Sequence, residues 1–141
     1  MKTATHLHFP GNAREAFEYY ARTFNGRIAL ALTYGDSPMA AQVTPQMRGQ
    51  LMHVRLEYGD QLLLGCDAPP ERYKASGGFS IAVLADAPEE AARIFGALAD
   101  GGTVSMAFGP TFWSQGFGMC TDRFGVQWMV NCERAPAAAA A

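Results

Sequence analysis

The residues best suited to chemistry in this chain are its three histidines. His6 and His8 lie two positions apart in the apolar stretch 5–9, and His53 begins a second stretch of alternating character, residues 53–57. Successive side chains of a β-strand point to opposite faces, so in two such strands all three imidazoles can share one face. Imidazoles gathered in this way can transfer protons, hold a metal ion or bind an acidic ligand. The competing interpretation is a solvated sheet face on which the histidines hydrogen-bond to polar neighbours.

A second group of candidate residues lies in the C-terminal half. In the alternating stretch 126–131, Gln127, Met129 and Asn131 share one face, and Trp128 belongs to the other, apolar face. This pattern predicts Trp128 in the core and Asn131 as a hydrogen-bonding group. Aromatic residues interleaved with glycine and serine precede this stretch, at Phe108, Phe112, Trp113 and Phe117. Such rings suit stacking on a planar ligand, and equally suit covering a hydrophobic edge or a dimer interface.

The cysteines and serines give little support for nucleophilic catalysis. Cys66, Cys120 and Cys132 show no C-x-x-C spacing, and their odd number fits buried, reduced thiols better than a disulfide framework. No G-x-S-x-G motif occurs in the sequence. Reduced thiols, together with an N-terminus that lacks a signal-peptide pattern, predict a cytoplasmic protein.

Composition and charge exclude two classes of partner. The formal net charge is −2 and the lysines and arginines are scattered singly, so the sequence offers no basic patch for nucleic acid or for an anionic membrane. No apolar run approaches the ~20 residues that a membrane-spanning helix requires. The sequence therefore predicts a small molecule or another protein as the partner.

The elements that must position these residues occur twice. In each half an apolar strand is followed by an amphipathic helix and then by three strands, so the predicted order is βαβββ repeated. Glu15 and Glu90 are 75 positions apart, as are Gly26 and Gly101, which aligns the two helices without a gap. The strands are expected at about 5–9, 27–35, 51–58, 61–66, 80–84, 103–109, 111–121 and 126–132.

Local signals mark the ends of the helices and the turns. Asn12 and Glu15 have the spacing of a capping box, and in the second helix Asp86 can cap while Pro88 lies in the first turn. Gly101 can end that helix in the left-handed conformation. The connecting segments are a two-residue hairpin loop at 59–60, a tight turn at 122–125, a long loop at 36–50, a linker at 67–78 and a low-complexity, alanine-rich tail at 135–141.

Several stretches carry a resemblance to a known family: 9–12 leading into 18–20, then 24–26, 111–113 with 116–118, and 121–131. They resemble the vicinal oxygen chelate superfamily, which includes glyoxalase, bleomycin-resistance and dioxygenase proteins, and in particular its PhnB-like branch. The resemblance implies an α+β domain over residues 1–134, in which two tandem βαβββ modules, about 4–66 and 79–132, form an open, cup-shaped half-barrel. It also implies a homodimer.

The resemblance further implies where a metal would bind. In metal-using members, four side chains, mostly His and Glu, enter the cup from the first and last strands of each module. Counted from the motifs, these positions fall on Thr5, or Ala4 if Pro10 shifts the register, and on Arg55, Ser80 and Met129. The set lacks good metal ligands, so no metal or cofactor is predicted. Some relatives are named as ubiquinone-pathway methyltransferases, but the chain lacks a glycine-rich turn that would hold a nucleotide-like methyl donor.

Two functional hypotheses remain. In the first, a homodimer binds a small organic molecule without the usual metal site. The predicted ligand-binding residues are His6, His8, His53, Arg55, Trp113, Met129 and Asn131. In the alternative, the protein is a metal-dependent lyase, isomerase or dioxygenase whose divalent metal is held by the histidines in a rearranged site, with Glu57 as the nearby acid.

Overall fold

The computed structural model describes residues 1–133. The chain divides into two compact units, Met1–Ala75 (unit 1) and Ser76–Ala141 (unit 2). The division falls inside the linker predicted at 67–78. The alanine-rich tail predicted at 135–141 lies outside the described residues.

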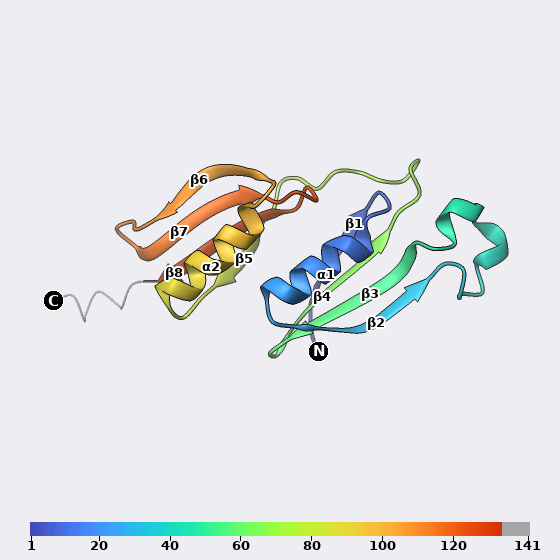
Figure 1. Ribbon diagram of the computed structural model, residues 1–141, viewed down its shortest axis with the longest axis horizontal. Coiled ribbons are helices and arrows are strands. Elements are labelled where there is room, and N and C mark those ends of the chain that lie inside the picture. Colours follow the sequence, from blue (N-terminus) through green and yellow to red (C-terminus); the bar gives the residue numbers. More distant parts are fainter. Residues whose placement is uncertain (134–141) are drawn as a thin grey trace. The chain divides into compact units, whose positions relative to one another are not determined.

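Unit 1 contains the first βαβββ module (Figure 1). Its elements are β1 (Thr5–Phe9), α1 (Ala13–Thr23), β2 (Arg27–Thr33), the short 3-10 helices η1 (Ala40–Gln42) and η2 (Pro45–Met47), β3 (Leu51–Tyr58) and β4 (Gln61–Asp67). The sheet order is β1-β4-β3-β2. β1 runs parallel to β4, and the other neighbouring pairs are antiparallel.

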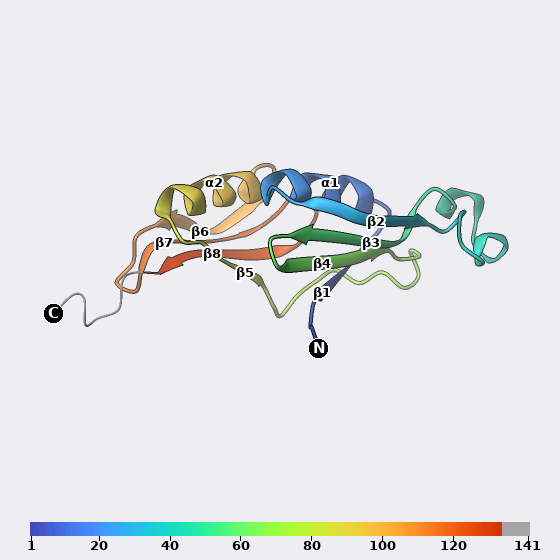
Figure 2. The same cartoon turned by 90° about the horizontal axis from the view of Figure 1, so that it is seen from below.

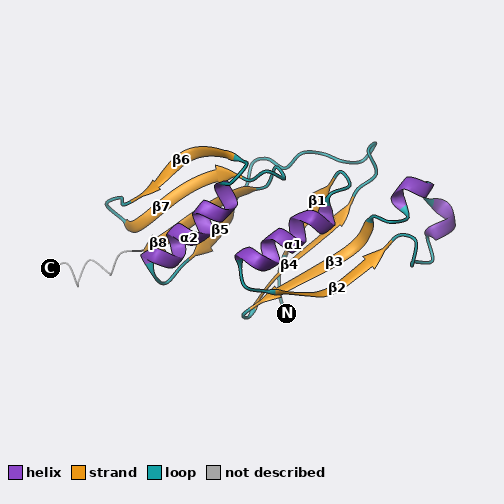
Figure 3. Cartoon of the chain, in the orientation of Figure 1, coloured by secondary structure: helices purple, strands orange, loops and turns teal. Residues whose placement is uncertain are grey.

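Unit 2 repeats this topology (Figure 3). Its elements are β5 (Ile81–Leu84), α2 (Pro88–Ala99), β6 (Thr103–Gly109), β7 (Ser114–Thr121) and β8 (Gln127–Glu133). The sheet order is β5-β8-β7-β6, with β5 parallel to β8. The predicted α+β architecture of two βαβββ modules with open sheets is therefore confirmed.

Each helix covers one face of its own sheet, and the opposite face carries no helix (Figure 2). We call the latter the open face. In unit 1, Leu7 and Phe9 are buried beneath α1, and the Phe9 and Phe17 rings pack edge to face with centroids 6.0 Å apart. Gly65 makes this packing possible, because a Cβ at that position would lie 2.5 Å from Cε2 of Phe17. Burial of these side chains by the hydrophobic effect holds the helix on the sheet.

Unit 2 is packed in the same way. Ile94, Phe95, Trp128 and Val130 are buried between α2 and the sheet. Gly118 leaves room for the Phe95 ring, since a Cβ there would lie 2.7 Å from Cε2 of that ring. Trp128 is only 1% exposed, as predicted, and its indole N–H donates to Oδ2 of Asp122 at 2.8 Å.

The first helix is capped by a residue that the sequence analysis did not identify. Among the described residues, Asn12 makes no side-chain hydrogen bond to the helix, so the predicted capping box is wrong. The Asp67 carboxylate takes its place: Oδ1 accepts hydrogen bonds from the N–H groups of Gly11 (3.1 Å) and Ala13 (2.9 Å), and Oδ2 accepts one from Leu51 (2.8 Å). Asp67 is in reach because β4 ends beside β1, where Asp67 pairs with Phe9.

The remaining local signals have mixed outcomes. The second helix starts with Pro88 as predicted, but its N-cap is Ala87, so Asp86 is not the cap. Gly101 has φ 75°, in the left-handed region expected at the end of this helix. The predicted loop at 36–50 contains η1 and η2. Among the described residues, no helix is long and apolar enough to cross a membrane.

Candidate functional site

The three histidines lie together on the open face of unit 1, as the strand alternation predicts. His6 and His8 project from β1, and their ring centroids are 4.9 Å apart. The ring of His53, from β3, is stacked near that of His6 with a centroid distance of 6.2 Å. Leu7 lies between the two histidines in the sequence, and Phe9 follows His8. Both side chains point to the helix-covered face and are buried. The side chains on the open face are exposed or half-buried, so a ligand can reach them.

The structure changes the register inferred for the first strand. Thr5 lies on the same face of β1 as buried Leu7 and Phe9, so it cannot face a site on the open side. In unit 2 the equivalent covered residues are Ile81 and Val83, which lie 74 positions after Leu7 and Phe9. The strand offset is thus one less than the helix offset of 75, because unit 2 has one more residue between its first strand and its helix. The position equivalent to Ser80 is therefore His6, and not Thr5 or Ala4.

The last strand of unit 1 also needs a correction. The sequence motifs predict Arg55, on β3, as the position equivalent to Met129. Met129 lies on β8 opposite Ala82 of β5, and the corresponding pair in unit 1 is Cys66 of β4 opposite His8 of β1. The equivalent of Met129 is therefore Cys66.

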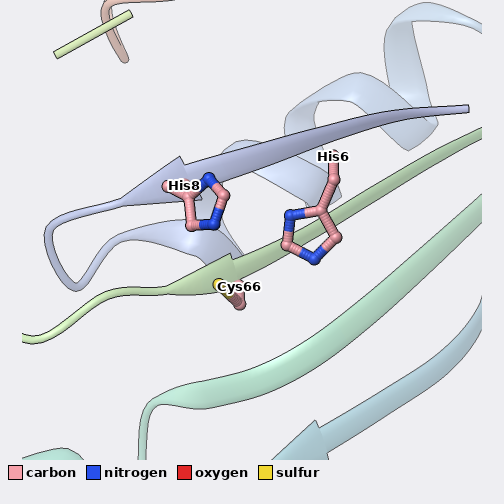
Figure 4. A group of neighbouring side chains, drawn as sticks. All are labelled: His6, His8 and Cys66. Atoms are coloured by element: carbon pink, nitrogen blue, oxygen red, sulfur yellow. The ribbon is translucent and has the colours of Figure 1, made fainter. Parts of the chain in front are cut away.

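Cys66 is the residue of this face that sequence reasoning missed. Its thiol and ring nitrogens of His6 and His8 all lie within 4.8 Å of one another. Figure 4 shows the three side chains gathered on neighbouring strands. The cysteines are free, as predicted, and Cys120 and Cys132 are buried while Cys66 is half-buried. Alternation along β4 places Cys66 on the face opposite to buried Leu63, and this can be inferred from the sequence. Which side chains lie next to Cys66, however, depends on the pairing of β4 with β1.

Arg55 lies on the open face of unit 1 in an ion-pair network. Its Nε donates to Oε2 of Glu57 at 2.8 Å, and Nη2 of Arg27 donates to Oε1 of the same carboxylate at 2.8 Å. The hydrogen bond from Arg55 is the main cause that lowers the pKa of Glu57, so this carboxylate is ionised at neutral pH. Both carboxylate oxygens of Glu57 accept hydrogen bonds from the two arginines. Glu57 is not part of the cluster of possible metal ligands formed by His6, His8 and Cys66. The acid that the metal-enzyme hypothesis requires is therefore not placed beside the histidines.

Two members of the cluster, His6 and Cys66, have shifted pKa values that favour their uncharged forms. Loss of hydration around its ring lowers the pKa of His6, and the neighbouring imidazoles of His8 and His53 lower it further. His6 is therefore neutral at physiological pH, which leaves a ring nitrogen able to accept a hydrogen bond or bind a cation. Burial raises the pKa of the Cys66 thiol, and the charge of Asp67 adds to this effect. The unliganded thiol is protonated at neutral pH.

The predicted site residues of unit 2 lie on its own open face or beside it. Met129 and Asn131 alternate with buried Trp128 and Val130 along β8. The side-chain oxygen of Asn131 is buried and has no hydrogen-bond partner among the described residues. Trp113 precedes β7, is 43% exposed, and packs edge to face on Phe112 and Phe117 with centroid distances of 4.7 and 5.5 Å.

The residues at the four positions of the family's metal centre do not match its ligand set. With the corrected register, these positions hold His6 and Cys66 in unit 1 and Ser80 and Met129 in unit 2. A neutral hydroxyl and a thioether are poor ligands for the divalent ions that such centres hold. The two positions of unit 2 therefore provide neither an imidazole nor a carboxylate.

Comparisons with known proteins give consistent matches over almost the whole chain. The family model described as 3-demethylubiquinone-9 3-methyltransferase matches residues 1–131. Protein YjdN of Escherichia coli K12 is 32% identical over 139 residues, covering 93% of this chain and 95% of that protein. The crystal structure of PA1353 from Pseudomonas aeruginosa is 43% identical with a TM-score of 0.87, covering 96% of this chain and 99% of that one. A PhnB protein from Bacillus cereus is 26% identical with a TM-score of 0.79, covering 94% and 99%.

A more distant structure defines the wider fold. The glyoxylase/bleomycin resistance protein/dioxygenase domain from Frankia sp. EAN1pec is 8% identical with a TM-score of 0.63, covering 95% of this chain and 98% of that one. At this identity the similarity concerns the fold alone. It confirms the resemblance to the vicinal oxygen chelate fold that the sequence motifs indicated.

Proposed function

Because this chain belongs to the PhnB-like family described as 3-demethylubiquinone-9 3-methyltransferase, within the vicinal oxygen chelate superfamily, we propose that it binds a small organic molecule that carries an acidic group. The observation that carries the proposal is the gathering of three imidazoles and Arg55 on a sheet face that no helix covers. Such a face combines hydrogen-bonding groups with a fixed positive charge, and these recognise carboxylates.

A recess lies beside Arg55. It has a volume of about 180 Å³ and is lined by two cations, Lys2 and Arg55, by two acids, Glu57 and Asp60, and by Leu62 and the rest of the β3–β4 turn. The two cationic side chains can donate hydrogen bonds to an anionic group in competition with the two acids, and the volume suits such a group rather than a whole molecule of several rings. The rest of the ligand would then extend over the open face toward the histidines.

Unit 2 offers contacts of a different kind. The unsatisfied oxygen of Asn131 is an acceptor for a ligand donor group, because a buried polar atom without a partner carries an energetic penalty that a bound molecule can remove. Trp113 and Met129 offer apolar and aromatic surface for stacking. These three residues are the predicted ligand contacts of unit 2, taken by itself.

The methyl-transfer activity in the family's name is not part of this proposal. Phosphate and carboxylate groups of cofactors can bind at helix N-termini through free backbone N–H groups. At the start of α1, the N–H groups of Gly11 and Ala13 are already bonded to the Asp67 carboxylate. An anionic cofactor would have to displace this buried side chain, which also holds Leu51.

The proposal includes a cytoplasmic homodimer. Its basis is the set of exposed apolar side chains in unit 2, where Leu84 is 69% and Phe112 is 90% exposed, together with β6, an edge strand whose side chains are largely exposed. Light scattering at micromolar concentration should give twice the chain mass of 15.2 kDa. A mass of 15.2 kDa would contradict the dimer.

The ligand proposal is tested by screening the metal-free protein against small organic acids, with thermal stabilisation as the first measure and calorimetry as the second. Arg55→Ala should weaken binding of a hit by about tenfold or more, since a charge-assisted hydrogen bond contributes roughly 1.5–3 kcal/mol. Arg93→Ala is the matched control, because Arg93 pairs with Glu90 on the surface of α2. The proposal fails if no acid binds, or if the two substitutions have the same effect.

A further inference from the structure

We propose that His6, His8 and Cys66 bind a single Zn²⁺ ion on the open face of unit 1, with one coordination position left for a donor atom from water or from the organic ligand. Binding of the metal ion is independent of the proposed function. Only the use of the fourth position rests on it.

The fold brings the three donors together from two neighbouring strands. His6 and His8 are on the same face of β1 because they are two residues apart, and Cys66 is the direct partner of His8 in the parallel pairing of β1 with β4. The donor atoms all lie within 4.8 Å of one another. Tetrahedral zinc with Zn–N of about 2.0 Å and Zn–S of about 2.3 Å needs its ligand atoms roughly 3.3–3.6 Å apart. Rotation of exposed side chains closes this difference without moving the core, since His6 and His8 are exposed.

The ligand types select the metal. Two imidazoles and a thiolate are the donors that zinc prefers, whereas Mg²⁺ and Ca²⁺ require oxygen ligands. Three protein ligands around zinc leave one position of the tetrahedron open, as in zinc sites that bind exogenous molecules. A neutral imidazole coordinates zinc through a ring nitrogen, and the thiol of Cys66 must release a proton when the metal binds.

The site is confined to one unit, which distinguishes it from the family's four-ligand centre. That centre takes ligands from the first and last strands of both modules. In unit 2 the positions of His6, His8 and Cys66 are held by Ser80, Ala82 and Met129, and these cannot form an equivalent site. His8 contributes a ligand from a position that the four-ligand set does not use.

The test is calorimetric titration of the full, chelator-treated and reduced chain with ZnCl2 alone. One ion per chain should bind, with release of a proton. His8→Ala and Cys66→Ala should each weaken binding by more than the roughly 10-fold to 100-fold that loss of an outer partner of a metal ligand costs. His53→Ala is the matched control: His53 lies beside His6 on the same face but is not one of the three ligands, so zinc affinity should stay within about threefold.

Cobalt substitution provides a second measurement that does not depend on affinity. Co²⁺ bound to the wild-type chain should show thiolate-to-cobalt charge-transfer absorption, which Cys66→Ala removes and His53→Ala retains. Circular dichroism establishes that each variant is folded. Absence of stoichiometric zinc binding, or zinc affinity and cobalt absorption that are unchanged in Cys66→Ala, would overturn the proposal. Because zinc is added without any organic compound, these outcomes are independent of the screen for acidic ligands, which uses metal-free protein.

Discussion

The two units share a topology, but their open faces differ in chemistry. In unit 1 this face carries three imidazoles, a thiol and an arginine–glutamate network. In unit 2, Met106 pairs with Met119 and Met119 with Met129, so three methionines lie in a row across β6, β7 and β8. Ala82 and Leu84 of β5 extend this apolar surface.

The helix-covered faces, in contrast, are packed in similar ways. Each helix lays a phenylalanine ring over a strand glycine, Phe17 over Gly65 in unit 1 and Phe95 over Gly118 in unit 2. The covered faces therefore fix the fold, and the open faces are where two copies of one topology differ in chemistry. The following substitutions test this division, in order of decreasing expected effect.

Asp67→Ala should reduce the free energy of unfolding by about 3 kcal/mol or more, because it leaves the N–H groups of Gly11, Ala13 and Leu51 without their acceptor. Asp86→Ala is the control in unit 2, where the acid does not cap the helix, and it should cost less than about 0.5 kcal/mol. Urea unfolding measures both values. Equal losses in the free energy of unfolding would mean that the two acids stabilise their helix starts alike, which would contradict the structure.

Gly65→Ala should destabilise the protein by about 1–3 kcal/mol, because the added methyl group collides with the Phe17 ring. Gly59→Ala is a control outside the packed face: nothing lies within 4 Å of its Cβ position, and its cost comes only from its φ of 58°. Combining Gly65→Ala with Phe17→Leu should recover part of the loss in a urea experiment. An unchanged loss in the double variant would argue against the steric explanation.

Trp113→Ala should weaken binding of an identified organic ligand by about 1–2 kcal/mol through lost aromatic contact, with the dimer intact. Calorimetry and light scattering on the same sample separate the two roles that the sequence left open for this ring. Loss of the dimer with unchanged ligand affinity would assign Trp113 to the subunit interface instead.

His53→Ala should weaken binding of an organic acid identified in the screen by about 1 kcal/mol, the contribution of one hydrogen bond. A useful companion is His53→Gln, which keeps a hydrogen-bonding side chain and should retain most of the affinity. If His53→Ala binds the ligand as tightly as the wild type, the histidine face of unit 1 is a solvated surface, as the competing interpretation held.

Local patterns predicted what depends on neighbours in sequence. Alternation placed His6 and His8 opposite Leu7 and Phe9 and put Trp128 in the core, and turn signals gave the hairpin at 59–60, where Gly59 has φ 58°. These features are set by strand geometry and by backbone conformation at single residues.

Features that depend on distant pairing were beyond the sequence. Asp67 caps α1, and Cys66 lies beside His8, only because β4 pairs in parallel with β1, more than fifty residues earlier in the chain. The register error at Thr5 has a related cause, since a constant offset between helices does not hold for strands when the connecting loops differ in length. Propensity and periodicity do not encode such contacts.

The most direct test of the difference between the open faces is a crystal of the full chain grown under reducing conditions with ZnCl2 and measured at the zinc absorption edge. We expect one anomalous peak per chain, bonded to ring nitrogens of His6 and His8 and to the sulfur of Cys66, and none on the methionine row of unit 2. A peak coordinated by other side chains, or a map with no peak at the three donors, would contradict it.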